Sequence, residues 1–238
     1  MIEGRTILAV VPARGGSKGI SLKNLRKVGG RSLVAHVGAI IRELPEIDRA
    51  VVSTDHADIA REAESVDIAA PFMRPKAIAS DYIGDVDVLS HALLAMEAID
   101  CRTYDIVVML QPTSPLRTAG EVSATIRMLV DGCWDSVWTV SPTDSKVHPL
   151  KQLAVSEGAL DYYDPSGADI IARQQMKPVY HRNGVAYAMT RACLLDQHTI
   201  KGKRTGALVI EDHHISIDTE WDLGLVEFLM ARRARAEA

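Results

Sequence analysis

The chain has 238 residues, of which 47% are hydrophobic and 24% are charged. This composition is typical of a folded globular protein and excludes a disordered or collagen-like chain. The formal net charge of −4 at pH 7 gives no reason to expect nucleic acid as a partner, because proteins that bind nucleic acid through overall charge are basic.

Strands and amphipathic helices alternate from the N-terminus to residue 140. Short runs rich in β-branched residues predict strands at residues 6–11, 50–53, 106–110 and 136–140. Apolar residues at helical spacing predict helices at 33–44, 58–65, 86–99 and 121–129. Ser32 is placed to cap the first of these helices. This order predicts an α/β fold in three α/β/α layers, with a mostly parallel sheet covered by helices on both faces.

The alternation weakens between residues 141 and 180. Four prolines interrupt this stretch, at positions 142, 149, 165 and 178. A plain loop of this length is uncommon inside a compact domain. We therefore expect residues 141–180 to be an insertion that folds against another surface, within a single domain spanning residues 1–238. Beyond the insertion, the pattern predicts strands at 185–189, 207–210 and 215–217 and a closing helix at 221–233.

The cysteines and the apolar runs bear on the compartment of the protein. Cys101, Cys133 and Cys193 are far apart and show no paired spacing that would indicate zinc or a disulfide framework. The longest apolar runs, at 7–11 and 106–110, are far shorter than the roughly 20 residues that span a bilayer. We expect a cytoplasmic protein with no membrane partner.

A basic, glycine-rich loop follows the first predicted strand. Between Pro12 and Arg31 there is no carboxylate, and there are six cations: Arg14, Lys18, Lys23, Arg26, Lys27 and Arg31. In α/β sheets ligands bind at the carboxyl ends of the strands, and glycines allow backbone N–H groups to approach an anion. The spacing matches neither the kinase-type phosphate loop nor the dinucleotide fingerprint. We interpret the loop as a polyphosphate site, with a solvated basic turn as the alternative.

The chain resembles the cytidylyltransferases that activate sialic acids and related nonulosonates. The loop at 9–19, Ala-Val-Val-Pro-Ala-Arg-Gly-Gly-Ser-Lys-Gly, followed by Lys23-Asn24, is similar to the signature loop of that family. Further similar segments follow in order at 52–55, 74–75, 111–117, 182–187 and 217–222. The resemblance implies a Rossmann-like nucleotidyltransferase that transfers CMP from CTP to the anomeric hydroxyl of a nonulosonic acid and releases pyrophosphate. It also implies a Mg²⁺ cofactor and a homodimer, in which the 141–180 insertion makes the dimer contact and reaches into the neighbouring active site.

The resemblance assigns roles to particular residues. Those expected to bind the nucleotide are Arg14, Ser17, Lys18, Lys23, Asn24 and Arg74. Gln111 and Arg173 are expected to bind the acidic sugar, and Asp218 to bind the metal. The expected catalytic set is Arg14, Lys18, Lys23 and Asp218.

Each assignment has a purely structural alternative. Arg74 and Arg173 are also explained as surface charges, and Gln111 as part of a proline-set turn. Asp218 or the adjacent Thr219 is also explained as the cap of the last helix.

Two departures from the family pattern affect the expected site. Many relatives have a second aspartate two positions before Asp218, where this chain has Ser216. In the basic loop, Ser21-Leu22 replaces a common Pro-Arg pair, which removes one cation and leaves Lys23 and Asn24 in register.

Two other functions stay open from the sequence. One is the same chemistry on the eight-carbon acid sugar Kdo, although those relatives usually lack a block such as Arg182–Tyr187. The other is a nucleotide-binding module of the same fold that has lost turnover, which Ser216 keeps open. The sequence also leaves open which nonulosonate is used: sialic acid, its deaminated form, legionaminate or pseudaminate.

Overall fold

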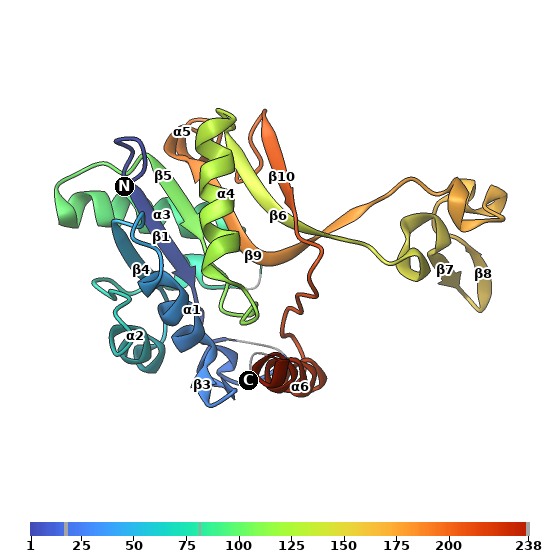
Figure 1. The fold of residues 1–238 in the computed structure, drawn as a ribbon, viewed down its shortest axis with the longest axis horizontal. Helices are drawn as coiled ribbons and strands as arrows, with labels where there is room; N and C mark the ends of the chain where they lie inside the picture. Colours follow the sequence, from blue (N-terminus) through green and yellow to red (C-terminus); the bar gives the residue numbers. More distant parts are fainter. Residues whose placement is uncertain (17–18, 81, 237–238) are drawn as a thin grey trace.

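A six-stranded sheet forms the centre of the protein. The computed structural model describes residues 1–16, 19–80 and 82–236 (Figure 1). The strand order is β10-β6-β9-β5-β1-β4. The strands are β1 (Ile7–Pro12), β4 (Arg49–Ser53), β5 (Ile106–Met109), β6 (Ser136–Pro142), β9 (Tyr180–Thr190) and β10 (Thr205–Val209). Only β9 runs antiparallel to its neighbours, β5 and β6, within this sheet. The predicted mostly parallel sheet is confirmed.

Helices cover both faces of the sheet. The helices α1 (Leu33–Arg42), α2 (Ala57–Glu64) and α4 (Ala119–Asp131) pack on one face, and α3 (Asp85–Asp100) and α5 (Arg191–Leu195) pack on the other. Strand β1 is buried on both faces of the sheet, which explains why its sequence is apolar throughout. Val11 faces the first core cluster and Val10 faces the second, and both are fully buried. The three-layer prediction is therefore confirmed.

Side-chain caps fix where two of the helices begin. The Ser32 hydroxyl accepts a hydrogen bond from the backbone N–H of Ala35 at 3.0 Å, so the predicted cap of α1 is confirmed. Thr118 and Glu121 form reciprocal hydrogen bonds at the start of α4. Each cap satisfies backbone groups that a helix end leaves without a partner.

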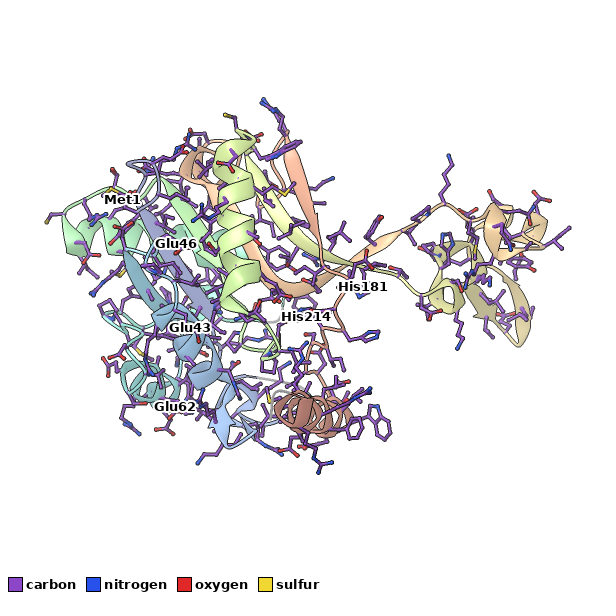
Figure 2. All side chains as sticks on the ribbon, in the orientation of Figure 1. Met1, Glu43, Glu46, Glu62, His181 and His214 are labelled. Atoms are coloured by element: carbon purple, nitrogen blue, oxygen red, sulfur yellow. The ribbon has the colours of Figure 1, made fainter. Side chains whose placement is uncertain are left out.

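Residues 141–180 form an arm that extends from the sheet between β6 and β9 (Figure 1). The arm contains a hairpin of β7 (Leu153–Ser156) and β8 (Ala159–Tyr162), together with short 3-10 turns. Every residue of the two hairpin strands is exposed. Figure 2 shows their side chains standing clear of the rest of the protein. The expectation that this arm packs against another surface stays a prediction.

A third core cluster joins the C-terminal helix to the basic loop. Helix α6 (Glu220–Ala236) contributes Leu223 and Val226 to this cluster, and the loop contributes Ile20. The small hairpin of β2 (Lys27–Val28) and β3 (Arg31–Ser32) packs beside them. No helix of the described residues is long and apolar enough to cross a membrane.

Two sequence predictions about strands are wrong. Residues 215–217 form no strand, because this segment runs between β10 and α6 without a partner strand. Ile217 is buried, and its backbone N–H donates a hydrogen bond to the carbonyl of Thr113, at 2.8 Å. Strand β9 begins at Tyr180, five positions before the predicted 185–189. Its first half was missed because it carries polar residues around an irregularity in the pairing with β6.

Candidate active site

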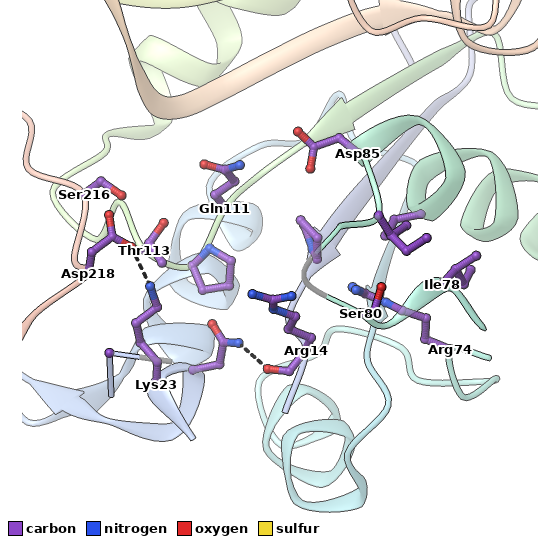
Figure 3. Close-up of a pocket in the computed structure, with 16 residues that line it drawn as sticks. Arg14, Lys23, Arg74, Ile78, Ser80, Asp85, Gln111, Thr113, Ser216 and Asp218 are labelled. Atoms are coloured by element: carbon purple, nitrogen blue, oxygen red, sulfur yellow. Dashed lines mark hydrogen bonds and ion pairs between the residues drawn. The ribbon is translucent and has the colours of Figure 1, made fainter. Parts of the chain in front are cut away.

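A pocket of about 570 Å³ lies at the carboxyl ends of β1 and β5 (Figure 3). Four segments line it: the loop after β1, the stretch from Arg74 to Val88, the turn after β5, and the segment before α6. These segments are far apart in sequence and meet because parallel strands end at the same edge of a sheet. The pocket therefore lies where the sequence predicted a ligand site.

The basic loop brings Arg14, Lys23 and Asn24 to this pocket. Asn24 is buried, and its side-chain amide donates to the Arg14 carbonyl at 3.0 Å, which ties the two ends of the loop together. Gly19 also lines the pocket, and a Cβ at this position would lie 2.3 Å from the backbone oxygen of Asp218. Only glycine allows this close approach. Ser17 and Lys18 lie outside the described residues.

Lys23 and Asp218 form an ion pair across the pocket wall. The Lys23 Nζ donates to Asp218 Oδ1 at 2.8 Å (Figure 3). It also donates to the Ile217 carbonyl at 2.8 Å. The Lys23 side chain is only 15% exposed, whereas that of Asp218 is 72% exposed. The ammonium group is thus fixed in place, and the carboxylate keeps one side open to the pocket.

The next residues form the cap of α6. The Asp222 carboxylate accepts hydrogen bonds from the backbone N–H groups of Asp218 and Thr219, and the Thr219 hydroxyl accepts one from the N–H of Asp222. Burial acts to raise the pKa of Asp222, but these hydrogen bonds hold it below its usual range. Thr219 and Asp222 therefore cap helix α6. The Asp218 carboxylate takes no part in this cap and lines the pocket.

The same segment is tied to α4 from the other side. The imidazole Nε2 of His214 lies 2.7 Å from Glu121 Oε1, and the His214 side chain is almost fully buried (Figure 2). Together with the bond between Ile217 and Thr113, this contact fixes the chain that carries Ser216 and Asp218.

The pocket offers few protein ligands for a metal. Asp218 and Ser216 line it together, and the described residues hold no cluster of three or more metal-binding side chains. Mg²⁺ in nucleotide sites is usually bound by one or two carboxylates, with phosphate oxygens and water completing the shell. The residues present thus fit a magnesium ion shared with a bound triphosphate and do not fit a cage built from protein alone.

Arg74 lies in the pocket wall opposite Lys23. Its side chain is buried, its Nε donates to Ser53 Oγ at 3.0 Å, and its Nη2 donates to the Ser53 carbonyl at 2.6 Å. Burial lowers the pKa of Arg74 to about 10, although Asp55 acts in the opposite direction. Arg74 remains a cation at neutral pH, and its burial contradicts the alternative interpretation as a surface charge.

Gln111 follows β5 and faces a bulge of β9. The buried Arg117 guanidinium donates to the carbonyls of both Gln111 and Gly184, which holds the two segments together. Gly184 has a φ of +72°, and a Cβ there would lie 2.5 Å from Ser114 Oγ and 2.9 Å from Gln111 Oε1. This close contact explains why the 182–187 block needs a glycine.

Asp85 is a pocket residue that sequence reasoning missed. It is the first residue of α3, directly after the capping residue Gly84. Burial raises the pKa of its carboxyl group, whereas Arg182 and Arg74 act in the opposite direction. The available signal was an acidic residue at a helix start, just after the loop that begins at Arg74. Taken alone, that signal indicates only a favourable interaction of the acid with the N-terminus of the helix.

Arg173 is not brought to this pocket within one chain. It lies on the arm, in a second cavity of about 390 Å³ that is also lined by Asp144, His148 and Lys177. The structure therefore brings together Arg14, Lys23, Asn24, Arg74, Gln111 and Asp218, and separates them from Arg173.

A solved structure shares the fold of this chain. The solved structure of a CMP:2-keto-3-deoxy-manno-octonic acid synthetase complexed with CTP matches this chain with a TM-score of 0.72 at 18% sequence identity. The match covers 96% of this chain and 99% of that one. The chain thus shares the fold of that synthetase, a three-layer α/β fold as the sequence predicted.

Sequence comparison then gives the family. The family model for cytidylyltransferases matches residues 8–230. A CMP-N,N'-diacetyllegionaminic acid synthase of Legionella pneumophila is 30% identical, over 94% of this chain and 96% of the relative. An N-acylneuraminate cytidylyltransferase of Escherichia coli is 28% identical over 80% of this chain, which spans 48% of that longer protein. The chain belongs to the cytidylyltransferase family, and the resemblance drawn from its motifs is confirmed.

Proposed function

We propose that this enzyme transfers CMP from CTP to the anomeric hydroxyl of a nonulosonic acid and releases pyrophosphate. The relatives that cover most of the chain and carry names of this activity support the substrate class. The structural observation that carries the proposal is the pocket itself. In it the cations Arg14 and Lys23 face the carboxylate Asp218 at the edge of the sheet where nucleotides bind in this fold class.

The proposed reaction is an in-line displacement at the α-phosphorus of CTP. The anomeric oxygen forms the new P–O bond, the bond to pyrophosphate breaks, and the hydroxyl proton leaves to solvent. Arg14, Lys23 and Asn24 bind the phosphates and stabilise the charge that develops on them. Ser17 and Lys18, in the same loop, are proposed to extend this contact. No covalent enzyme intermediate is needed.

Asp218 is the residue proposed to hold Mg²⁺. Magnesium bound there would neutralise part of the charge on the pyrophosphate leaving group. Lys23 and the α6 cap position the Asp218 carboxylate for this task. The Ser216 hydroxyl lines the same wall, where many relatives carry a second aspartate.

Gln111 and Arg173 are proposed to bind the acidic sugar. Gln111 reaches the pocket from its own chain, whereas Arg173 would come from the arm of a second subunit in a homodimer. Exposed apolar side chains on the arm support such a contact, among them Val155 (72% exposed) and Leu160 (65% exposed). The planar guanidinium of Arg173 suits a carboxylate, which it can bind with two hydrogen bonds.

A cytoplasmic location is also part of the proposal. All three cysteines are free thiols, and two of them, Cys101 and Cys133, are exposed. Exposed free thiols fit a reducing compartment, where CTP is also available.

Pyrophosphate release tests the proposed reaction. Purified enzyme is incubated with CTP, Mg²⁺ and, in turn, sialic acid, its deaminated form, legionaminate, pseudaminate and the eight-carbon Kdo. We expect release with at least one nine-carbon acid. Release with Kdo alone would show that the rival substrate is correct, and CTP binding without release from any sugar would favour the inactive module.

A further inference from the structure

The nucleotide pocket contains a carboxylate that the proposed reaction does not use. Asp85 lines the pocket at the start of α3, and Figure 3 shows it on the wall across from Asp218. Two arginines, Arg74 and Arg182, act on it electrostatically. A partly buried acid in a pocket for a polyanion is costly, so it needs a specific partner.

The two ends of the pocket differ in chemistry. Lys23 lies at one end beside Asp218, and Arg14 lies between Lys23 and Arg74, so these two cations suit the phosphates (Figure 3). Arg74 and Ile78 lie at the other end, and Asp85 lies on the wall across from Asp218 (Figure 3). Ile83 and Val88 add apolar lining to the same pocket. A flat, largely apolar base fits the second end. Its polar edge would then meet one fixed donor, Arg74, and one acceptor, Asp85.

Cytosine and uracil differ in the groups that would face this pair. Cytosine presents an exocyclic amino group that donates, beside ring N3 and O2 acceptors. Uracil presents a carbonyl oxygen in place of the amino group and an N–H at position 3. An ionised carboxylate can accept a hydrogen bond and cannot donate one. It would therefore bond the amino group of cytosine and repel the corresponding oxygen of uracil.

We propose that Asp85 selects the nucleotide by accepting a hydrogen bond from the exocyclic amino group of cytosine, while Arg74 donates to the acceptors on the same edge. The inference rests on the proposed function, because it takes the ligand of the pocket to be CTP. Asp85 is then a specificity-determining residue that contacts the substrate, and it takes no part in the displacement at phosphorus.

Two other roles for Asp85 agree less well with the structure. If Asp85 were a second metal ligand, the metal ion would lie beside the positive charges of Arg74 and Arg182, on the wall away from Asp218. A favourable interaction with the α3 dipole explains an acid at the helix start and does not explain why it lines the pocket. Asp87, in the same first turn, supplies that interaction while exposed to solvent.

The Asp85→Asn variant tests the proposal, because the asparagine amide has the same shape and can donate to the uracil oxygen. Binding of CTP and of UTP in the presence of Mg²⁺ is measured by isothermal titration calorimetry for the wild type and the variant. We expect the wild type to prefer CTP, and the variant to show a preference at least about tenfold smaller, with tighter UTP binding. The matched control, Asp87→Asn, removes the same charge from the same helical turn and should keep the wild-type preference.

The outcomes separate this inference from the proposed function. If the wild type binds CTP and Asp85→Asn keeps the wild-type preference, or loses both nucleotides equally, the role of Asp85 is wrong and the proposed function stands. If the wild type binds neither nucleotide, the proposed function itself fails. Asp85→Ser provides a second variant should Asp85→Asn fold poorly. Its hydroxyl both donates and accepts, so a reduced preference is again expected, and an unchanged preference contradicts the proposal.

Discussion

The ion pair of Lys23 and Asp218 joins a cation and a carboxylate that come from two separate segments of the pocket wall. One partner belongs to the loop after β1 and the other to the segment before α6. Because the lysine side chain is 15% exposed, its position is fixed before any ligand arrives, which lowers the ordering cost of binding. The pair therefore prepares the pocket for a ligand that carries both phosphates and a metal.

Replacing Lys23 with alanine removes a phosphate donor and leaves Asp218 without its partner. One charge-assisted hydrogen bond contributes about 1.5–3 kcal/mol, so we expect kcat/KM for CTP to fall about 10-fold to 100-fold. The measurement is initial-rate kinetics with CTP varied. Lys27→Ala removes an exposed lysine of β2, four positions further along the chain, and is the control. Equal losses in the two variants would contradict a specific role for Lys23.

Most candidate site residues were predictable because their positions follow from strand ends. Arg14 and Gln111 come directly after apolar runs that could only be central strands, and such strands end at one edge of the sheet. Asp85 was not predictable, because an acidic residue at a helix start gives no local signal that it lines a pocket. Arg173 was assigned by resemblance alone, and its distance from the pocket appears only in the structure.

The β9 bulge shows how one element shapes the site through its backbone. The sequence predicted only the second half of β9, since the bulge interrupts the alternation that marks a strand. The bulge presents Gly184 to the Gln111 turn, so a side chain here would push on Gln111. Boundaries of this kind depend on a partner strand and are poorly encoded in local sequence.

Gly184→Ala should destabilise the protein by about 1–3 kcal/mol, from a positive φ and a contact with two side chains. It should also raise the KM for the acidic sugar, since Gln111 must move. Gly158→Ala is the control, because Gly158 also has a positive φ, +84°, and has no atom within 4 Å of the added Cβ. Thermal unfolding and sugar-dependent kinetics are measured together. An unchanged sugar KM in a folded Gly184→Ala enzyme would contradict this account of the bulge.

Helix α3 is joined to α5 by an ion pair between Glu97 and Arg191. The guanidinium donates two hydrogen bonds to the carboxylate, at 2.8 and 3.0 Å. These hydrogen bonds from Arg191 lower the pKa of Glu97 from its ordinary value of 4.5, although burial opposes the shift. A lowered folded-state pKa stabilises the protein above the unfolded-state pKa, and the gain is lost as the pH falls through the folded-state value.

Glu97→Gln should therefore lower the melting temperature at pH 7 by about 2–4 °C, which corresponds to about 1 kcal/mol for a pair whose arginine is partly exposed. The difference from the wild type should shrink as the pH falls below 4.5, the ordinary pKa of the group. Melting curves of both proteins at a series of pH values check this. A difference that stays constant down to pH 3 would show that the ion pair is not its source.

The arm extends away from the sheet, and in the proposed homodimer it would complete the site of the second subunit. Figure 1 shows the hairpin of β7 and β8 held away from the sheet that carries the pocket. Ile171 on the arm is 93% exposed, and Tyr163 is 75% exposed. A monomer would leave these apolar groups in water. In a homodimer the second subunit would cover them, and Arg173 of the arm would enter the pocket of that subunit.

Mixing two inactive variants tests whether Arg173 acts in the neighbouring subunit. Lys23→Ala and Arg173→Ala should each lose most activity as homodimers. In a mixed dimer one of the two sites has both residues intact, so exchange of subunits should restore activity at about a quarter of all sites. Pyrophosphate release is measured before and after co-refolding. No recovery, despite mixed dimers seen by mass spectrometry, would contradict the reach of the arm into the partner's site.

The central claim is that the cationic rim of the sheet binds the triphosphate of a cytidine nucleotide. Calorimetric titration of the enzyme with CTP and with CMP, in Mg²⁺, tests it most directly when repeated on Arg14→Ala. We predict that CTP binds much more tightly than CMP, and that the variant loses at least about tenfold in CTP affinity with little change for CMP. Equal binding of CTP and CMP, or an Arg14→Ala variant that binds CTP as the wild type does, would contradict the account.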